Sequence, residues 1–200
     1  FPVNEKNSYY VGLGYTYNKI SNFAYEYNRD LYMKSMNLTG NSIKTNDFDF
    51  SFGWNYNSLN RGYFPTKGVK ASLGGRVTVP GSDNKYYKLS AELQGFYPLD
   101  RDHRWVLSGK ATASYASGLG GKRVPFYQFY TAGGIGSLRG FAYGAVGPNA
   151  IYRDKYDKWY QSTDVVGGNA MATATVELIV PTPFVGDKSQ NSVRTSLFVD

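Results

Sequence analysis

Apolar and polar side chains alternate one by one along seven segments of this 200-residue chain, and no apolar face among them carries a charge. Side chains of an extended strand point alternately to opposite faces, so this period of two predicts strands with one apolar and one polar face. The segments are Tyr9–Asn18, Asp47–Asn57, Val69–Pro80, Tyr86–Tyr97, Arg104–Tyr115, Asn169–Val180 and Val193–Asp200. The chain is therefore predicted to be all-β.

Several of the apolar faces end in aromatic side chains with small or aliphatic residues between them, a pattern typical of strands that cross a membrane. In one segment the two faces are Tyr87, Leu89, Ala91, Leu93, Gly95 and Tyr97, against Lys88, Ser90, Glu92 and Gln94. Ten residues rising ~3.3 Å each, in a strand tilted by about 45°, climb roughly 23 Å, close to the ~25 Å apolar band of an outer-membrane barrel. The pattern favours a transmembrane barrel over a soluble sandwich, whose strands also alternate.

The connections between the segments alternate in character as well. The compact stretches Leu59–Gly68, Pro98–His103 and Pro181–Ser192 fall on one side of the sheet, whereas Lys19–Asn46, Gly81–Lys85 and Ser117–Gly168 fall on the other. Outer-membrane barrels have short turns on the periplasmic side and longer loops outside the cell. The long loop 117–168 is therefore predicted to be extracellular, although the short connection at 81–85 departs from the trend.

The composition excludes other classes of protein. The 19 Tyr, 12 Phe and 23 Gly suit β structure, and no run of 18 apolar residues could form a membrane-spanning helix. The absence of cysteine excludes disulfides and thiolate metal sites. The net charge of +7 comes from scattered basic residues, which argues against nucleic acid as a partner.

Little in the sequence points to an enzyme. The single histidine, His103, lies in a turn-like stretch, and there is no nucleophile elbow or phosphate-binding loop followed by a helix. The pairs Asp47/Asp49 and Asp100/Asp102 lack an organised calcium loop, so we expect these acids to be solvated. We predict no enzymatic activity, no metal and no other cofactor.

The stretch GGIGSLRGFAYGAVGP, Gly133 to Pro148, fits no strand or helix pattern and sets one cation, Arg139, among glycines. Glycine accepts positive φ and close approach, which allows such a loop to fold back into a barrel. There Arg139 would meet Glu177 and Asp200, which the alternation places inward on adjacent strands, and a guanidinium can bind two carboxylates. From the residues alone, a solvated arginine on the cell surface is an equal alternative.

Several segments, in consistent order, resemble the BamA family of outer-membrane protein assembly factors, within the POTRA-barrel insertase superfamily. Ser137–Phe141 (SLRGF) is similar to the Val-Arg-Gly-Phe motif of that family, with Leu138 in place of valine. The other similar segments are Arg61–Gly68, Pro80–Lys88, Gly118–Lys122, Pro125–Gly134, Gly167–Ala172, Pro181–Phe184 and Asn191–Asp200. The resemblance spans nearly the whole chain.

An odd number of strands predicts part of a larger barrel, since bacterial single-chain barrels have even numbers. The resemblance implies an antiparallel up-and-down transmembrane barrel of about sixteen strands, of which residues 1–200 supply about seven. POTRA domains would precede this piece, and the first and last strands of the barrel would lie outside it. The motif residues Leu138, Arg139, Gly140 and Phe141 would reach into the barrel, with Arg139 against Glu177 and Asp200.

The resemblance also implies a function. The parent protein would be integral to the bacterial outer membrane and would fold and insert other outer-membrane β-barrel proteins without covalent chemistry. Its partners would be the lipid bilayer, nascent outer-membrane proteins and accessory lipoproteins. A related translocator of the two-partner secretion type, which shares an inward loop, and a passive porin are the alternatives.

Overall fold

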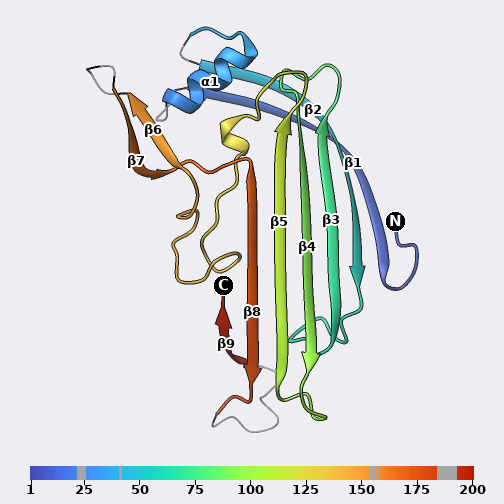
Figure 1. The fold of residues 1–200 in the computed structure, drawn as a ribbon. Coiled ribbons are helices and arrows are strands. Elements are labelled where there is room, and N and C mark those ends of the chain that lie inside the picture. The colour runs from blue at the N-terminus through green and yellow to red at the C-terminus, as the bar shows by residue number, and fades with distance from the viewer. Residues whose placement is uncertain (22–25, 41, 154–155, 157, 184–192) are drawn as a thin grey trace.

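The computed structural model describes residues 1–21, 26–40, 42–153, 156, 158–183 and 193–200. Its main element is one antiparallel sheet of seven strands in the order β1-β2-β3-β4-β5-β8-β9 (Figure 1). The strands are β1 (Asn7–Ser21), β2 (Ser42–Asn57), β3 (Gly68–Thr78), β4 (Tyr86–Pro98), β5 (Val106–Gly118), β8 (Ala170–Val180) and β9 (Thr195–Val199). Within this sheet, strands that follow one another in sequence are also neighbours in space, which confirms the predicted up-and-down arrangement.

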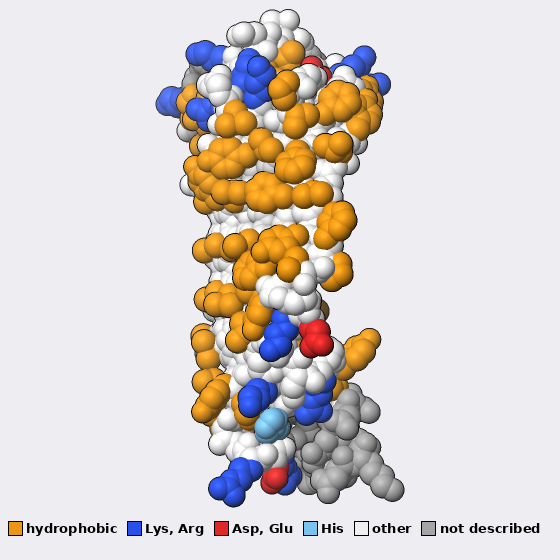
Figure 2. Space-filling model, turned by 90° about the vertical axis from the view of Figure 1, so that its right-hand side faces the viewer, with side chains coloured by type: hydrophobic (Ala, Val, Ile, Leu, Met, Phe, Trp, Pro, Cys, Tyr) orange, Lys and Arg blue, Asp and Glu red, His pale blue; other side chains and the backbone are white. Residues whose placement is uncertain are grey.

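The register of the sheet gathers the predicted apolar faces on one side. Leu13 pairs with Phe50, and Phe50 pairs in turn with Val77. Likewise Leu93 pairs with Ala111 on the next strand. Because directly paired residues point to the same face, the hydrophobic side chains form rows across the outer surface, as Figure 2 shows. An apolar surface of this extent is suited to hydrocarbon rather than to water.

The other face of the sheet carries the charges. Glu92 lies 3.6 Å from the Nζ atom of Lys70 and 3.4 Å from that of Lys110, and Arg76 donates to Asp49 at 2.6 Å. The expectation that Asp49 is solvated is wrong, because its side chain is only 7 % exposed beneath Arg76. The two residues lie diagonally across β2 and β3, a relation that depends on register and is not visible in either strand alone.

A helix, α1 (Glu26–Met36), lies within the predicted loop at 19–46 and covers one end of the sheet (Figure 1). Tyr32 and Met33 pack against Ile43 of β2, and all three are buried. The Tyr32 hydroxyl donates to Asn84, whose backbone and side-chain N–H groups donate to Asp47 at 2.9 and 2.6 Å. Burial raises the pKa of the Tyr32 hydroxyl above its usual value, which keeps it a donor. Asp47 is therefore a buried acceptor and not a solvated acid as predicted.

The long loop at 117–168 contains regular structure that the sequence did not predict. It includes a short 3-10 turn, η1 (Phe126–Gln128), and a two-stranded hairpin of β6 (Asn149–Arg153) and β7 (Trp159–Val165). The rings of Tyr152 and Tyr160, opposite each other in this hairpin, are 5.7 Å apart. A period of two is not visible because β6 has only five residues and β7 begins with two adjacent aromatic residues, Trp159 and Tyr160.

The remaining expectations concern element boundaries. The alternation predicts that Trp105 and Val193 belong to strands, but they lie just outside β5 and β9. Of the compact connection at 181–192, residues 184–192 lie outside the described residues. In the part of the chain that the structure describes, no helix has the length and hydropathy needed to cross a membrane.

Candidate functional site

The glycine-rich stretch from Gly133 to Pro148 forms a tight loop with Arg139 near its tip. The backbone N–H of Leu138 donates to the carbonyl of Gly134 at 3.0 Å, and the N–H of Gly134 donates to the carbonyl of Phe141 at 3.0 Å. The Ser137 hydroxyl donates to the carbonyl of Gly133 and accepts from its N–H. These bonds close the loop on itself, so the arginine is presented by an ordered turn.

Arg139 projects onto the polar face of the sheet and meets Asp200. Its Nε and Nη2 atoms donate to the two carboxylate oxygens at 3.0 and 2.7 Å, and its backbone N–H adds a third bond at 2.8 Å. The Asp200 side chain is 5 % exposed and the Arg139 side chain 24 %. The bidentate geometry with a shared backbone donor fixes both the position and the orientation of the guanidinium.

Glu177 is the second acid beside Arg139. Its Oε2 atom lies 3.8 Å from Nη1 of the arginine, at the outer limit of an ion pair. The other carboxylate oxygen accepts from the hydroxyl of Ser196 on the neighbouring strand. The structure thus brings both predicted acids to the arginine, with Asp200 as the close partner and Glu177 as the distant one.

Two further residues complete the site, and the sequence did not single them out. The Thr175 hydroxyl donates to Asp200 at 2.8 Å, so this carboxylate has one partner on β8 and one on the loop. The guanidinium of Arg139 lies over the ring of Phe198, 3.4 Å from its centroid, in a cation–π contact. Alternation already places Thr175 and Phe198 on the inward face, but only the register brings them beside the loop.

The other residues of the motif have different surroundings. Leu138 is half-buried, whereas Phe141 is 56 % exposed. Gly140 has a φ of 87°, in the left-handed region that favours glycine. Gly140 thus turns the chain directly after Arg139.

A second contact holds the loop to the wall. Lys88 of β4 donates from Nζ to the backbone carbonyl and the side-chain oxygen of Gln128, both at 3.2 Å. The same ammonium lies 4.4 Å from the centroid of the Tyr130 ring. Together with Arg139, this lysine attaches the long loop to the polar face at two separate places.

Within the stretch from Gly133 to Pro148, Gly133 is the position that least tolerates a side chain. Its φ is 121°, and an added Cβ would collide with the carbonyl oxygen of Ala142. We expect Gly133→Ala to weaken the closed loop by about 1–3 kcal/mol, measured as faster limited proteolysis within residues 117–168. Gly136→Ala is the matched control, since a Cβ there meets nothing within 4 Å. Equal protection of the two variants would contradict the requirement for glycine at 133.

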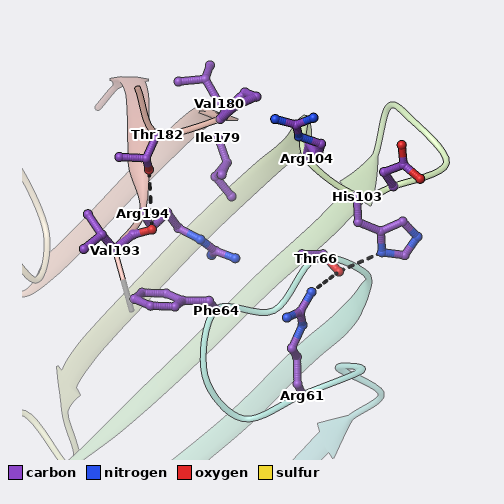
Figure 3. Close-up of a pocket in the computed structure, with 12 residues that line it drawn as sticks. Arg61, Phe64, Thr66, His103, Arg104, Ile179, Val180, Thr182, Val193 and Arg194 are labelled. Atoms are coloured by element: carbon purple, nitrogen blue, oxygen red, sulfur yellow. Dashed lines mark hydrogen bonds between the residues drawn. The ribbon is translucent and has the colours of Figure 1, made fainter. Parts of the chain in front are cut away.

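His103, expected to be a solvated turn residue, lies instead against another turn at the opposite end of the sheet. Its Nδ1 atom is 2.8 Å from the Thr66 hydroxyl, and both residues line a pocket with Arg194 (Figure 3). Arg194 donates to the carbonyl of Pro65 at 2.8 Å and lies over the ring of Phe64. These contacts join the short turns at this end of the sheet to one another.

Within the described ranges, no group of three or more acids or histidines is arranged to hold a metal ion.

Comparisons with known proteins agree with this arrangement. The family model of the Omp85 superfamily domain matches residues 1–200. The outer membrane protein assembly factor BamA of Neisseria meningitidis is 32 % identical over 163 residues, which make up 81 % of this chain and 19 % of that protein.

A solved structure agrees with the fold in detail. The crystal structure of BamA from Haemophilus ducreyi lacking POTRA domains 1–3 is 53 % identical, with a TM-score of 0.95. The match covers 99 % of this chain and 38 % of that one, so the chain spans well under half the length of the relatives it matches. The motif-based resemblance is thereby confirmed. We conclude that this chain belongs to the Omp85 superfamily and has the partial barrel and the outer-membrane location that its sequence predicts.

Proposed function

We propose that this chain is part of an assembly factor that folds and inserts β-barrel proteins into the outer membrane. The observation that carries the proposal is the likeness to BamA over 99 % of the chain. The contact of Arg139 with Asp200 supports it. A loop fixed to the inner face of the barrel wall is better suited to an assembly factor than to an open diffusion pore. Residues 1–200 would form one part of a single barrel domain, with the loop 117–168 on the extracellular side and POTRA domains elsewhere in the parent protein.

The proposed work is non-covalent. An assembly factor of this kind would offer strand edges on which an incoming chain adds its own strands, since main-chain hydrogen bonds supply the affinity. No nucleotide, metal or other cofactor and no enzymatic step belongs to this proposal. The partners would be the bilayer, nascent outer-membrane proteins and accessory lipoproteins. The seven strands described here would act as lipid-facing wall and as the anchor of the inward loop.

The test is reconstitution of the full-length parent protein in liposomes. We expect it to speed the folding of a urea-unfolded outer-membrane barrel protein by about tenfold or more, a barrier lowered by about 1.4 kcal/mol. Folding is followed by the mobility of unheated samples on gels, and liposomes containing an unrelated porin are the control. Equal rates in both preparations would contradict an assembly function. Release of a soluble polypeptide across the membrane would favour a translocator, and ion conductance that persists without residues 117–168 would favour a porin.

A further inference from the structure

The β1–β2 hairpin carries a pair of lysines at its extracellular end. Lys19 and Lys44 are directly opposite each other in the register, and both are exposed. By alternation they share the outward face with Tyr17 and with the other apolar residues of β1. Like charges directly opposite on a sheet destabilise the pairing, so this arrangement favours an anion held between the two ammonium groups.

The position of this pair matches the depth of lipid head groups. Lys19 lies two residues beyond Tyr17, the last aromatic residue on the outward face of β1, which is about 7 Å along the strand. At the end of the aromatic row, the Tyr15 hydroxyl donates at 2.8 Å to Asn46, which lies directly opposite Tyr17. The outer surface thus changes from apolar to amphipathic to cationic over two rungs, as a membrane interface requires.

The hairpin end is held so that the lysines stay on the outer side. Ile43 and Thr45, which alternate with Lys44, are buried on the inner side, with Ile43 beneath α1. Lys85, a third exposed lysine, lies two residues before Tyr87 on the outward face of β4 at the same end of the sheet. Figure 2 shows Lys and Arg side chains gathered beyond the hydrophobic band at this end, with few acids among them.

The described residues supply no carboxylate that neutralises the pair. None of their ion pairs involves Lys19 or Lys44. The nearby carboxylate of Asp83 accepts from the backbone N–H of Asn46 at 2.6 Å and from its side chain at 3.4 Å. The anion that would balance these charges must therefore come from outside this part of the chain.

We propose that Lys19 and Lys44 bind the phosphorylated head group of a lipid in the outer leaflet. Ammonium groups bind phosphate as point charges, and the surrounding face is already the lipid-contacting wall of the barrel. The site is continuous with that wall and lies away from the inward loop, so it does not depend on the proposed assembly function. It would hold a lipid against the β1–β2 hairpin, on the side opposite α1.

The experiment measures binding of lipid A, with and without its phosphates, to the full-length protein in detergent micelles by native mass spectrometry. We expect the wild type to prefer the phosphorylated lipid by about 25-fold, roughly fivefold per lysine. Lys19→Gln/Lys44→Gln should lose this preference, and Lys19→Arg/Lys44→Arg should keep it. Lys67→Gln/Arg101→Gln, which removes two exposed charges at the other end of the sheet, should also keep it.

Three outcomes would overturn the proposal. The first is an equal affinity of the wild type for the two lipids. The second is an unchanged preference in Lys19→Gln/Lys44→Gln, or an equal loss in the control at the other end. The third is displacement of the lipid by inorganic phosphate at the same phosphate concentration, which would show a site for the free ion. A folded barrel, judged by gel mobility of unheated samples, is required of every variant compared.

Discussion

Replacing Arg139 by alanine is expected to release the long loop from the barrel wall. The substitution leaves Asp200, 5 % exposed, without its bidentate partner, and removal of one member of a buried ion pair costs about 3–5 kcal/mol. Because Arg139 is itself 24 % exposed, we expect about 3 kcal/mol. Cleavage of the loop by added protease should then rise about 100-fold, since it follows the population of the open form. Assembly of other barrel proteins should fall with it if the anchored loop serves that function.

The conservative variants separate charge from geometry. Arg139→Lys keeps the charge but cannot make the bidentate contact with Asp200, so we expect partial protection of the loop. Glu177→Gln should have a smaller effect than Asp200→Asn, because Glu177 lies 3.8 Å from the arginine whereas Asp200 makes three hydrogen bonds with it. A cleavage pattern of Arg139→Ala identical to that of the wild type would contradict the anchoring role.

A charge at Leu93 is expected to prevent stable insertion, whereas the same charge one residue later is tolerated. Leu93 is on the outward face of β4, and the residue is 55 % exposed. Leu93→Glu would place a carboxylate in hydrocarbon, at a cost of about 2 kcal/mol or more. Gln94 points inward and pairs with Lys70 and Lys110. Gln94→Glu would therefore place a carboxylate between two lysines that are already there.

The full-length parent protein and its variants are folded into lipid vesicles. Folding is measured by resistance to urea and by the gel mobility of unheated samples. We expect the urea midpoint of Leu93→Glu to fall well below that of the wild type, and that of Gln94→Glu to stay level or rise. Equal midpoints for the two variants would mean that the two faces of β4 are wrongly assigned. The pair is closely matched, because the same side chain is introduced at adjacent positions.

The sheet shows how far local pattern determines this fold. Side chains of a strand alternate between faces for geometric reasons, so the faces of residues such as Leu93 and Glu177 could be assigned from their neighbours in sequence. For the same reason the inward direction of Asp200 was predictable. The glycines around Arg139 indicated a tight turn, and Gly133 and Gly140 do have positive φ.

What could not be predicted depends on pairings between distant segments. Asp47 and Asp49 look like solvated acids in the sequence, yet one is buried by Asn84 and the other by Arg76. Helix α1 forms in a segment with few apolar residues because Tyr32 and Met33 find Ile43 to pack against. Good helix formers such as Leu31 and Lys34 are present in this segment, but tertiary packing supplies most of the stability of a helix of 11 residues.

The sequence by itself determined the seven strands of the large sheet and the face to which each of their side chains points. Only the tertiary structure decided which inward residues meet. Glu177 and Asp200 were the predicted partners of Arg139, but only the register of β8 and β9 places Asp200 beside Thr175 and Phe198 under the loop. The physical reason is that alternation is a property of one strand, whereas register is set by contacts between strands and by the loops that connect them.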